Sequence, residues 1–256
     1  MNFKLVEANL RESFRALAEG QERADVAELA GVTLASAGVA FQMFNAAFLN
    51  GPVGTRSELI GRVEMASRHF DSKKMGWSFW VCEDWIAKDE RRGLSRVCAD
   101  FGLRLVSDLP GFAAVELEPG RPRPVNFEIL EVASAQQMMD FQAVGALCFR
   151  VPPAWFAEVF RDPVWQRGRF RCFVGYRDGA PVATSALLED GGVAGIYNVA
   201  VLPGQRHRGY AEAVTRHAIR AARGAGTAIL QSTAEGRRMY GKMGFRDVTR
   251  ILVYAS

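Results

Sequence analysis

A basic, glycine-containing loop stands between an apolar run and an amphipathic run in residues 201–214, VLPGQRHRGYAEAV. The apolar run VAGIYNVAV at its start predicts a strand, and residues 210–223 predict a helix with small apolar side chains on one face. The N-terminus of a helix presents backbone N–H groups without partners, and Gly209 lets a ligand approach them closely. Together with Arg206 and Arg208, these groups suit a phosphate or a pyrophosphate.

Two common nucleotide-binding motifs do not fit this loop. The P-loop requires a Gly-Lys-Ser/Thr ending, which is absent, and the dinucleotide fingerprint requires GxGxxG, whereas only Gly209 and the small Ala211 stand here. A basic connection that binds no ligand is the alternative interpretation.

The loop resembles the pyrophosphate loop of the GNAT superfamily of acyl-CoA-dependent N-acyltransferases. It has the pattern R-x-x-G-x-A, formed by Arg206, Gly209 and Ala211, shortly after the strand-ending Pro203. The downstream MYGKMGF, residues 239–245, is similar to the second signature of that superfamily, a tyrosine on a short helix followed by a glycine and an aromatic that begin the last strand. The resemblance covers about residues 125–256.

The resemblance implies an α/β fold with a mixed, mostly antiparallel sheet flanked by helices, and acetyl-CoA as the co-substrate, without a metal. In such enzymes the strand before the loop splays from its neighbour, and the pantetheine arm pairs with the exposed strand backbone. Transferred to this chain, Val199 and Val201 contact the pantetheine. The residues implied at the pyrophosphate are Arg206, His207, Arg208, Gly209, Tyr210 and Ala211.

Acyl transfer from a thioester to an amine requires a proton for the departing thiolate, which a phenol can donate. Tyr240 stands where the superfamily places this general acid; the alternative is a tyrosine that only packs. The base is less evident, because Gly195 and Tyr197 stand where many members carry a glutamate. Glu189 and Asp190 on the preceding strand could act through water, or could belong to a solvated turn.

A proline-rich stretch, EPGRPRPV at residues 118–125, marks the predicted domain junction. We therefore expect an N-terminal domain at residues 1–120 and an acyl-CoA-binding domain at residues 121–256. The second half predicts the order β α α β β β α β α β. In the first half we expect helices over residues 5–17, 56–70 and 90–101, and strands over residues 32–35, 39–44, 77–81, 103–106 and 113–117.

The order of elements in the first half resembles a degenerate GNAT half, as in tandem members of the superfamily that keep one working CoA site. Such a half could form one wall of the acceptor site. Asn45, Trp80 and Trp85 are the candidate lining residues.

Composition limits the other function classes. The chain has 256 residues, and its halves differ in charge: residues 1–120 hold 14 Lys and Arg against 17 Asp and Glu, whereas residues 121–256 hold 18 against 11. The basic half favours an anionic ligand, but no dense basic run with interleaved aromatics indicates nucleic acid. The four cysteines and three histidines do not cluster, so no metal site is predicted. No signal peptide or apolar span is evident, and we expect a cytoplasmic protein without a membrane partner.

The sequence therefore predicts an N-acetyltransferase that moves an acetyl group from acetyl-CoA to an amine of a small molecule or protein, with Tyr240 as the general acid. An acyl-CoA-binding sensor without transferase activity is the alternative, because the strand before the loop lacks a carboxylate. A nucleic-acid-binding module that uses the basic half is a weaker third interpretation.

Overall fold

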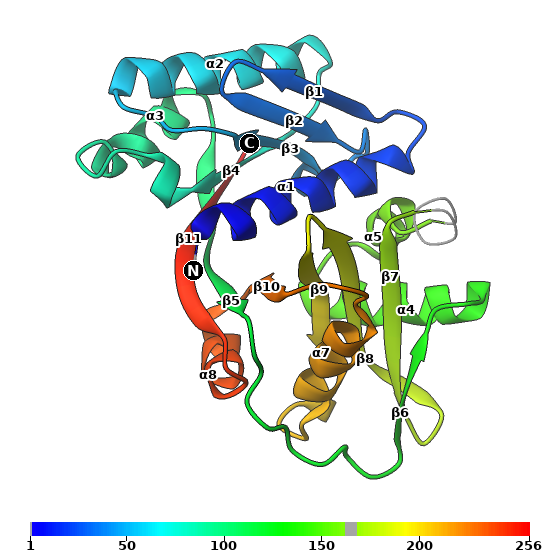
Figure 1. Ribbon diagram of the computed structural model, residues 1–256. Helices are drawn as coiled ribbons and strands as arrows, with labels where there is room; N and C mark the ends of the chain where they lie inside the picture. The colour runs from blue at the N-terminus through cyan, green and yellow to red at the C-terminus, as the bar shows by residue number, and fades with distance from the viewer. Residues whose placement is uncertain (1, 162–167) are drawn as a thin grey trace.

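The computed structural model describes residues 2–161 and 168–256, whose strands form one continuous sheet of eleven strands (Figure 1). The strands are β1 Asp25–Leu29, β2 Val32–Ser36, β3 Asn45–Leu49, β4 Ser78–Cys82, β5 Arg104–Ala114, β6 Phe127–Glu131, β7 Phe170–Arg177, β8 Ala180–Asp190, β9 Val193–Val201, β10 Thr227–Gln231 and β11 Arg246–Ala255. The α-helices are α1 Phe3–Glu19, α2 Arg56–Ser72, α3 Leu94–Asp100, α4 Ala135–Phe149, α5 Pro153–Val159, α7 Tyr210–Ala221 and α8 Ala234–Lys242. The pairs β3–β4 and β9–β10 are parallel and the other named pairs are antiparallel, which confirms the expected mixed sheet.

The sheet exchanges strands between the two halves of the chain. Its order is β1-β2-β3-β4-β11-β5-β10-β9-β8-β7-β6, so the last strand of the chain, β11, lies between β4 and β5 of the first half. In turn, β5 pairs with β10 of the second half. Residues 118–125 form no helix or strand, as expected, but the sheet continues across the predicted domain junction.

Helices cover both faces of the sheet. On one face, α1 crosses the middle of the molecule and α4 and α5 cover the second half; α2, α3, α7 and α8 lie on the other face (Figure 1). The apolar side of α1 joins both halves, because Val6 packs against Ala113 and Val193 while Phe14 packs in the core of the first half. Burial of this apolar side against both halves is the physical reason that α1 lies across the centre.

Local signals predicted most of the second half correctly. Ser134 caps α4 by accepting a hydrogen bond from Gln137 N at 3.2 Å, and Asp178 and Gly179 form the β7–β8 turn with φ of 48° and 79°. The amphipathic helix expected over residues 210–223 is α7, which ends at Ala221.

Three expectations for the first half were wrong. Residues 39–44 are not a strand but a connection with a 3₁₀ turn at Gln42–Phe44, and the strand follows at Asn45–Leu49. The two strands expected over 103–106 and 113–117 are one strand, β5, which passes through Pro110. Pro110 is tolerated because its backbone faces the end of β10, where its carbonyl accepts from Ser232 N at 3.1 Å and the named β5–β10 pairs have stopped at Gly111. Strand β1 was not expected at all.

Candidate functional site

The ladder between β9 and β10 ends inside the sheet. Its last pair is Ile196 with Leu230, after which β9 continues along β8 as far as Val201. Leu202 N donates to Val182 O on the β8 side at 3.0 Å. Because the backbone groups of a strand alternate in direction, those of Val201 and Val199 point to the opposite side, toward the end of β10. Arg206 Nε donates to Val201 O at 3.5 Å, so the backbone groups of Val199 are the ones that the strand offers where its neighbour has left.

A bulge accompanies this divergence. Asn198 has φ of 50°, and the register between β8 and β9 shifts between Thr184 and Ala186. The Thr184 hydroxyl donates to Asn198 O at 2.9 Å, which holds the bulged backbone on β8. An extra residue in one strand bends that strand, so the bulge is the local cause of the divergence of β9 from β10, which the resemblance implied.

The loop after β9 leads directly into the N-terminus of α7. Gly209 is the cap residue, with φ of 84°, and no side chain caps the helix. Within residues 2–161 and 168–256, no hydrogen bond is made by the N–H groups of Gly209, Tyr210 or Ala211. Unpartnered amides at the positive end of a helix dipole form a site for an anion.

The side chains of the loop divide into exposed and buried ones. Arg206, His207 and Arg208 are exposed, and the Arg206 guanidinium lies 3.8 Å from the Glu235 carboxylate at the start of α8. Tyr210 is buried and stacks on Phe127 with ring centroids 4.3 Å apart. Of Tyr210, the backbone N–H is therefore the group that can meet a ligand, whereas the two arginines can add positive charge through their side chains.

Tyr240 lies on α8, on the same face of the sheet as the side chains of Val199 and Val201, and packs in the same apolar cluster. Its ring is 6.2 Å from that of Phe112 and 5.8 Å from that of Phe245. Burial raises the pKa of Tyr240 to about 12, although a hydrogen bond with Thr215 acts in the opposite direction. The phenol is therefore protonated at neutral pH, as a proton donor must be.

The carboxylates considered as bases are occupied. Glu189 accepts a hydrogen bond from Arg223 N at 2.5 Å, beyond the end of α7. Asp190 is paired with Arg169 at 2.7 Å. Both acids stabilise the fold around β8, so the interpretation of a structural role fits better than that of a base acting through water.

The two positions of β9 at which a carboxylate was considered, Gly195 and Tyr197, both contact Asn9 of α1, which the sequence did not reveal. The Asn9 side chain of α1 lies over Gly195, so that a Cβ at residue 195 would overlap Asn9 Oδ1. Tyr197 donates its hydroxyl to the same oxygen at 2.6 Å. The one available signal was the presence of polar Asn9 and Ser13 on the apolar side of an amphipathic helix, where both are buried.

The lining residues expected from the first half are not part of this arrangement. The Asn45 amide donates to Val39 O and Gly76 O at 2.8 and 3.1 Å, and its oxygen accepts from Ser36, so its role is structural. Trp80 donates its indole N–H to the Ser78 hydroxyl. The first half reaches the end of the β9–β10 ladder through α1 instead.

The corresponding loop of the first half, between β3 and α2, is filled by the chain itself. Gly54 N donates to the Glu58 carboxylate at 2.9 Å, and Glu58 N donates to the Thr55 hydroxyl at 3.2 Å. Val53 is buried and forms a parallel bridge with Ile86. The loop amides and the space beside β4 are therefore already used.

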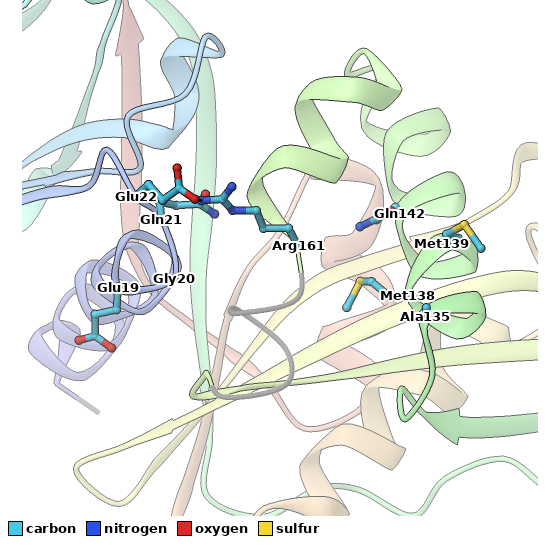
Figure 2. A pocket seen from close by; sticks show the side chains of 9 residues that line it. All are labelled: Glu19, Gly20, Gln21, Glu22, Ala135, Met138, Met139, Gln142 and Arg161. Carbon is cyan, nitrogen blue, oxygen red and sulfur yellow. The ribbon is translucent and has the colours of Figure 1, made fainter.

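A cavity of about 610 Å³ lies elsewhere, between the end of α1 and the start of α4 (Figure 2). Met138 and Gln142 line it from α4, and Glu22 lies 4.0 Å from Arg161 at its rim. The cavity contains none of the residues predicted from the loop or from α8. Within the described residues, no group of three or more His, Cys, Asp or Glu could hold a metal ion.

Comparison with known proteins identifies the fold. Residues 138–245 match the family model described as "Acetyltransferase (GNAT) family". No curated protein sequence matches the chain significantly. The segment from Met138 in α4 to Phe245, just before β11, is therefore similar to a GNAT acetyltransferase domain.

Solved structures extend the likeness to nearly the whole chain. A GCN5-related N-acetyltransferase from Kribbella flavida is 20% identical, with 98% of this chain and 95% of that chain covered and a TM-score of 0.73. A functionally unknown conserved protein from Staphylococcus epidermidis is 14% identical, with 91% and 94% covered and a TM-score of 0.65. A GCN5-related N-acetyltransferase from Sphaerobacter thermophilus is 17% identical, with 88% and 76% covered and a TM-score of 0.60. The fold is thus shared over both halves.

Proposed function

We propose that the protein transfers an acetyl group from acetyl-CoA to an amine, at the point where β10 leaves β9. The observation that carries this proposal is the combination of the strand backbone at Val199, which faces no neighbouring strand, with unpartnered amides at Gly209 and Ala211 in the described part of the chain. The Val201 carbonyl accepts a hydrogen bond from Arg206 Nε at 3.5 Å, which a bound pantetheine would displace. Extended backbone suits the amides of a pantetheine arm, and the start of α7 suits its pyrophosphate. Both features follow one another along a single stretch of chain, as one long ligand would require.

The loop side chains complete the binding site in this proposal. Arg206 and Arg208 neutralise the pyrophosphate, and His207 lies beside them at the surface. Gly209 and Ala211 leave room for close approach, because neither has a long side chain. The Val199 backbone N–H points toward the end of β10 and can stabilise the oxyanion that forms at the thioester carbonyl.

Transfer then proceeds by direct attack of a neutral amine on the thioester carbonyl carbon. The C–N bond forms, the nitrogen of the tetrahedral intermediate loses a proton to solvent, and the C–S bond breaks with the electron pair left on sulfur. Tyr240, which its raised pKa keeps protonated at neutral pH, donates its proton to the sulfur as this bond breaks and regains a proton from solvent. Because the nearby acids are engaged, the amine must lose its proton to solvent before attack.

We further infer that the first half is a second GNAT-like unit without a CoA site. It repeats the order of three strands, a helix and a parallel fourth strand, and apart from the extra edge strand β6 the sheet order is symmetric about the contact of β11 with β5. Glu58 satisfies the loop amide that a phosphate would use, and the hydrogen bond from Gly54 lowers the pKa of that carboxyl. A resident carboxylate at this position would repel an anion.

A thermal-shift comparison with acetyl-CoA, longer acyl-CoAs and CoA tests the binding step. A ligand that binds only the folded state must raise the Tm, so an unchanged Tm at high acetyl-CoA would remove the proposal. An amine panel followed by detection of free CoA thiol then tests transfer.

An acyl-CoA sensor without transferase activity is the second candidate, because no free carboxylate accompanies the strand before the loop. It predicts the same rise in Tm and no thiol with any amine. Steep salt dependence of DNA or RNA binding would instead favour the nucleic-acid interpretation. Among the described helices, none is long and apolar enough to cross a membrane.

A further inference from the structure

Asn9 of α1 and Tyr197 of β9 form a buried polar pair between the two halves of the chain. The Tyr197 hydroxyl donates to Asn9 Oδ1 at 2.6 Å, and Asn9 is 2% exposed. Ser13, one turn further along α1, is also buried and donates its hydroxyl to Leu10 O at 2.6 Å. A polar group at such a position is retained at a cost in free energy unless its hydrogen-bonding capacity is used.

The pair has capacity left on both sides. In the described part of the chain, Asn9 Nδ2 has no hydrogen-bond partner, although it is buried. Ser13 lies within hydrogen-bonding reach of the Tyr197 hydroxyl. The Ser13 hydrogen is directed to Leu10 O and the Tyr197 hydrogen to Asn9, so the phenolic oxygen can still accept a hydrogen bond. Burial raises the pKa of Tyr197, which keeps the phenol neutral. One unused donor and one available acceptor therefore belong to two hydrogen-bonded side chains.

The pair lies where the β9–β10 ladder ends. Gly195, under Asn9, is paired with Ile229, and Ile196 with Leu230 is the last pair. Tyr197 is the next residue of β9 that faces α1, and Gln231 is its counterpart on β10. In the described residues, Gln231 Nε2 is likewise buried without a partner. Two amide donors thus occur at this point on the α1 face.

This face is opposite to the face on which the acyl donor would bind. Val199 and Val201 pack in the apolar cluster that includes α7 and Tyr240 of α8. Asn9 belongs to α1, and Tyr197 packs in the clusters on the α1 face of the sheet. The amine adds to one face of the planar thioester carbonyl, and for an acyl group held between β9 and β10 the face toward α7 and α8 is covered by the acyl donor. The amine therefore approaches from the α1 face.

We propose that Asn9 and Tyr197 bind the acceptor, and that the acceptor is a small molecule with a carboxylate or carbonyl oxygen next to its amine. The amine N–H donates to the Tyr197 oxygen, while the neighbouring oxygen accepts from Asn9 Nδ2. Because these two side chains are hydrogen-bonded to each other, the amine and the oxygen must lie on adjacent atoms of the acceptor. This inference rests on the proposed acetyl transfer and names the chemical class of its second substrate.

Matched amine pairs test this class directly. Glycine is compared with methylamine, and phenylalanine with 2-phenylethylamine, in the presence of acetyl-CoA and with free CoA thiol as the readout. We expect kcat/KM to be at least about tenfold higher for the amino acid of each pair, which corresponds to about 1.4 kcal/mol. Equal use of both members would overturn the proposal.

The variant Asn9→Asp separates binding from folding. It keeps the oxygen that accepts from Tyr197 and replaces the free donor by a second oxygen. We expect KM for the amino acids to rise about tenfold more than KM for 2-phenylethylamine, with a smaller change in kcat. Asn2→Asp is the control, because it adds the same charge to the same helix at its exposed cap.

A second variant covers the case in which Asn9→Asp does not fold. Tyr197→Phe removes the acceptor oxygen and keeps the ring, and it should weaken both members of each amine pair. The rise of Tm with acetyl-CoA reports separately on the CoA site. If acetyl-CoA raises the Tm but no amino acid yields thiol, the proposal about the acceptor is wrong. It is also wrong if Asn9→Asp still prefers the amino acid of each pair. If acetyl-CoA does not raise the Tm, the proposed transfer itself is wrong.

Discussion

The amide oxygen of Asn9 lies against Gly195, in the space that a side chain at residue 195 would occupy. Gly195 belongs to β9 of the second half, and Asn9 belongs to the first helix of the chain. The first half thus reaches into the strand that leads to the loop. Glycine at residue 195 is required by this contact rather than by its backbone conformation, because its φ is not positive.

Gly195→Ala tests this contact. The added methyl overlaps Asn9 and must displace α1, and such overpacking costs about 1–3 kcal/mol in the free energy of unfolding. The double variant Asn9→Gly with Gly195→Ala removes the overlap with Asn9 and leaves only the contact with the Tyr197 ring. It should therefore show positive coupling, measured by urea unfolding of the four proteins of the cycle. Strict additivity would show that the two residues do not touch.

The pH dependence of transfer tests the absence of an enzymatic base. If the amine loses its proton to solvent, the acidic limb of kcat/KM reports the pKa of the amine, since only the neutral amine attacks. Changing the acceptor to a less basic amine should move this limb to lower pH. Asp190→Asn should leave the limb in place, because Asp190 is paired with Arg169. A limb that stays fixed when the amine changes would indicate a base on the protein.

Tyr240→Phe tests the proton donor. Removing a general acid lowers turnover by about 10²- to 10⁴-fold, whereas the dissociation constant of acetyl-CoA should hardly change, because the ring still fills the same cluster. Steady-state kinetics and calorimetric titration measure the two effects. Tyr254→Phe is the control, since Tyr254 is buried in the first half and contacts Ser95. Equal losses in turnover and affinity would remove Tyr240 from this role.

Gly209→Ala tests the pyrophosphate loop. Gly209 has φ of 84°, so any side chain costs about 1–2 kcal/mol in backbone strain. We also expect the acetyl-CoA dissociation constant to rise by at least about tenfold, because the methyl obstructs approach to the α7 amides. Gly179→Ala is matched in strain, with φ of 79° at the β7–β8 turn. It should show a similar loss of stability with unchanged affinity; a parallel loss of affinity would mean that strain alone explains the first variant.

Glu7 makes the stability of α1 depend on pH. Burial raises the pKa of Glu7, and the ion pair with Arg11 at 2.9 Å opposes this only in part. A carboxyl whose pKa is higher in the folded state contributes stability below its unfolded pKa, and this contribution is lost as the pH rises through its folded pKa. The free energy of unfolding of the wild type should therefore fall relative to Glu7→Gln as the pH rises above about 4.5. Urea unfolding of both proteins at a series of pH values measures this difference. If the pKa of Glu7 were the same in the folded and unfolded states, the difference in the free energy of unfolding would not change with pH.

Local signals were enough for the elements that surround the loop. Proline and glycine mark the ends of β9 and α7, and the Asp178–Gly179 turn fixes the β7–β8 hairpin through its positive φ values. These effects act over a few residues and are legible in a single sequence. The first half was predicted less well, because Asn45 and Pro110 sit in strands against their local preference and are held there by contacts distant in sequence.

The sequence by itself determined the candidate loop and the tyrosine that follows it, since each belongs to a short motif of neighbouring residues, and the resemblance that these motifs carry implied the type of sheet. Only the tertiary structure decided that β11 inserts between β4 and β5, and that Asn9 takes the space above Gly195. Both are pairings between the two ends of the chain, selected by burial and hydrogen bonding across the whole sheet. Such pairings leave no local pattern in the sequence. A strand such as β11 could form the same backbone hydrogen bonds with other strands, and the complete fold decides which strands become its neighbours.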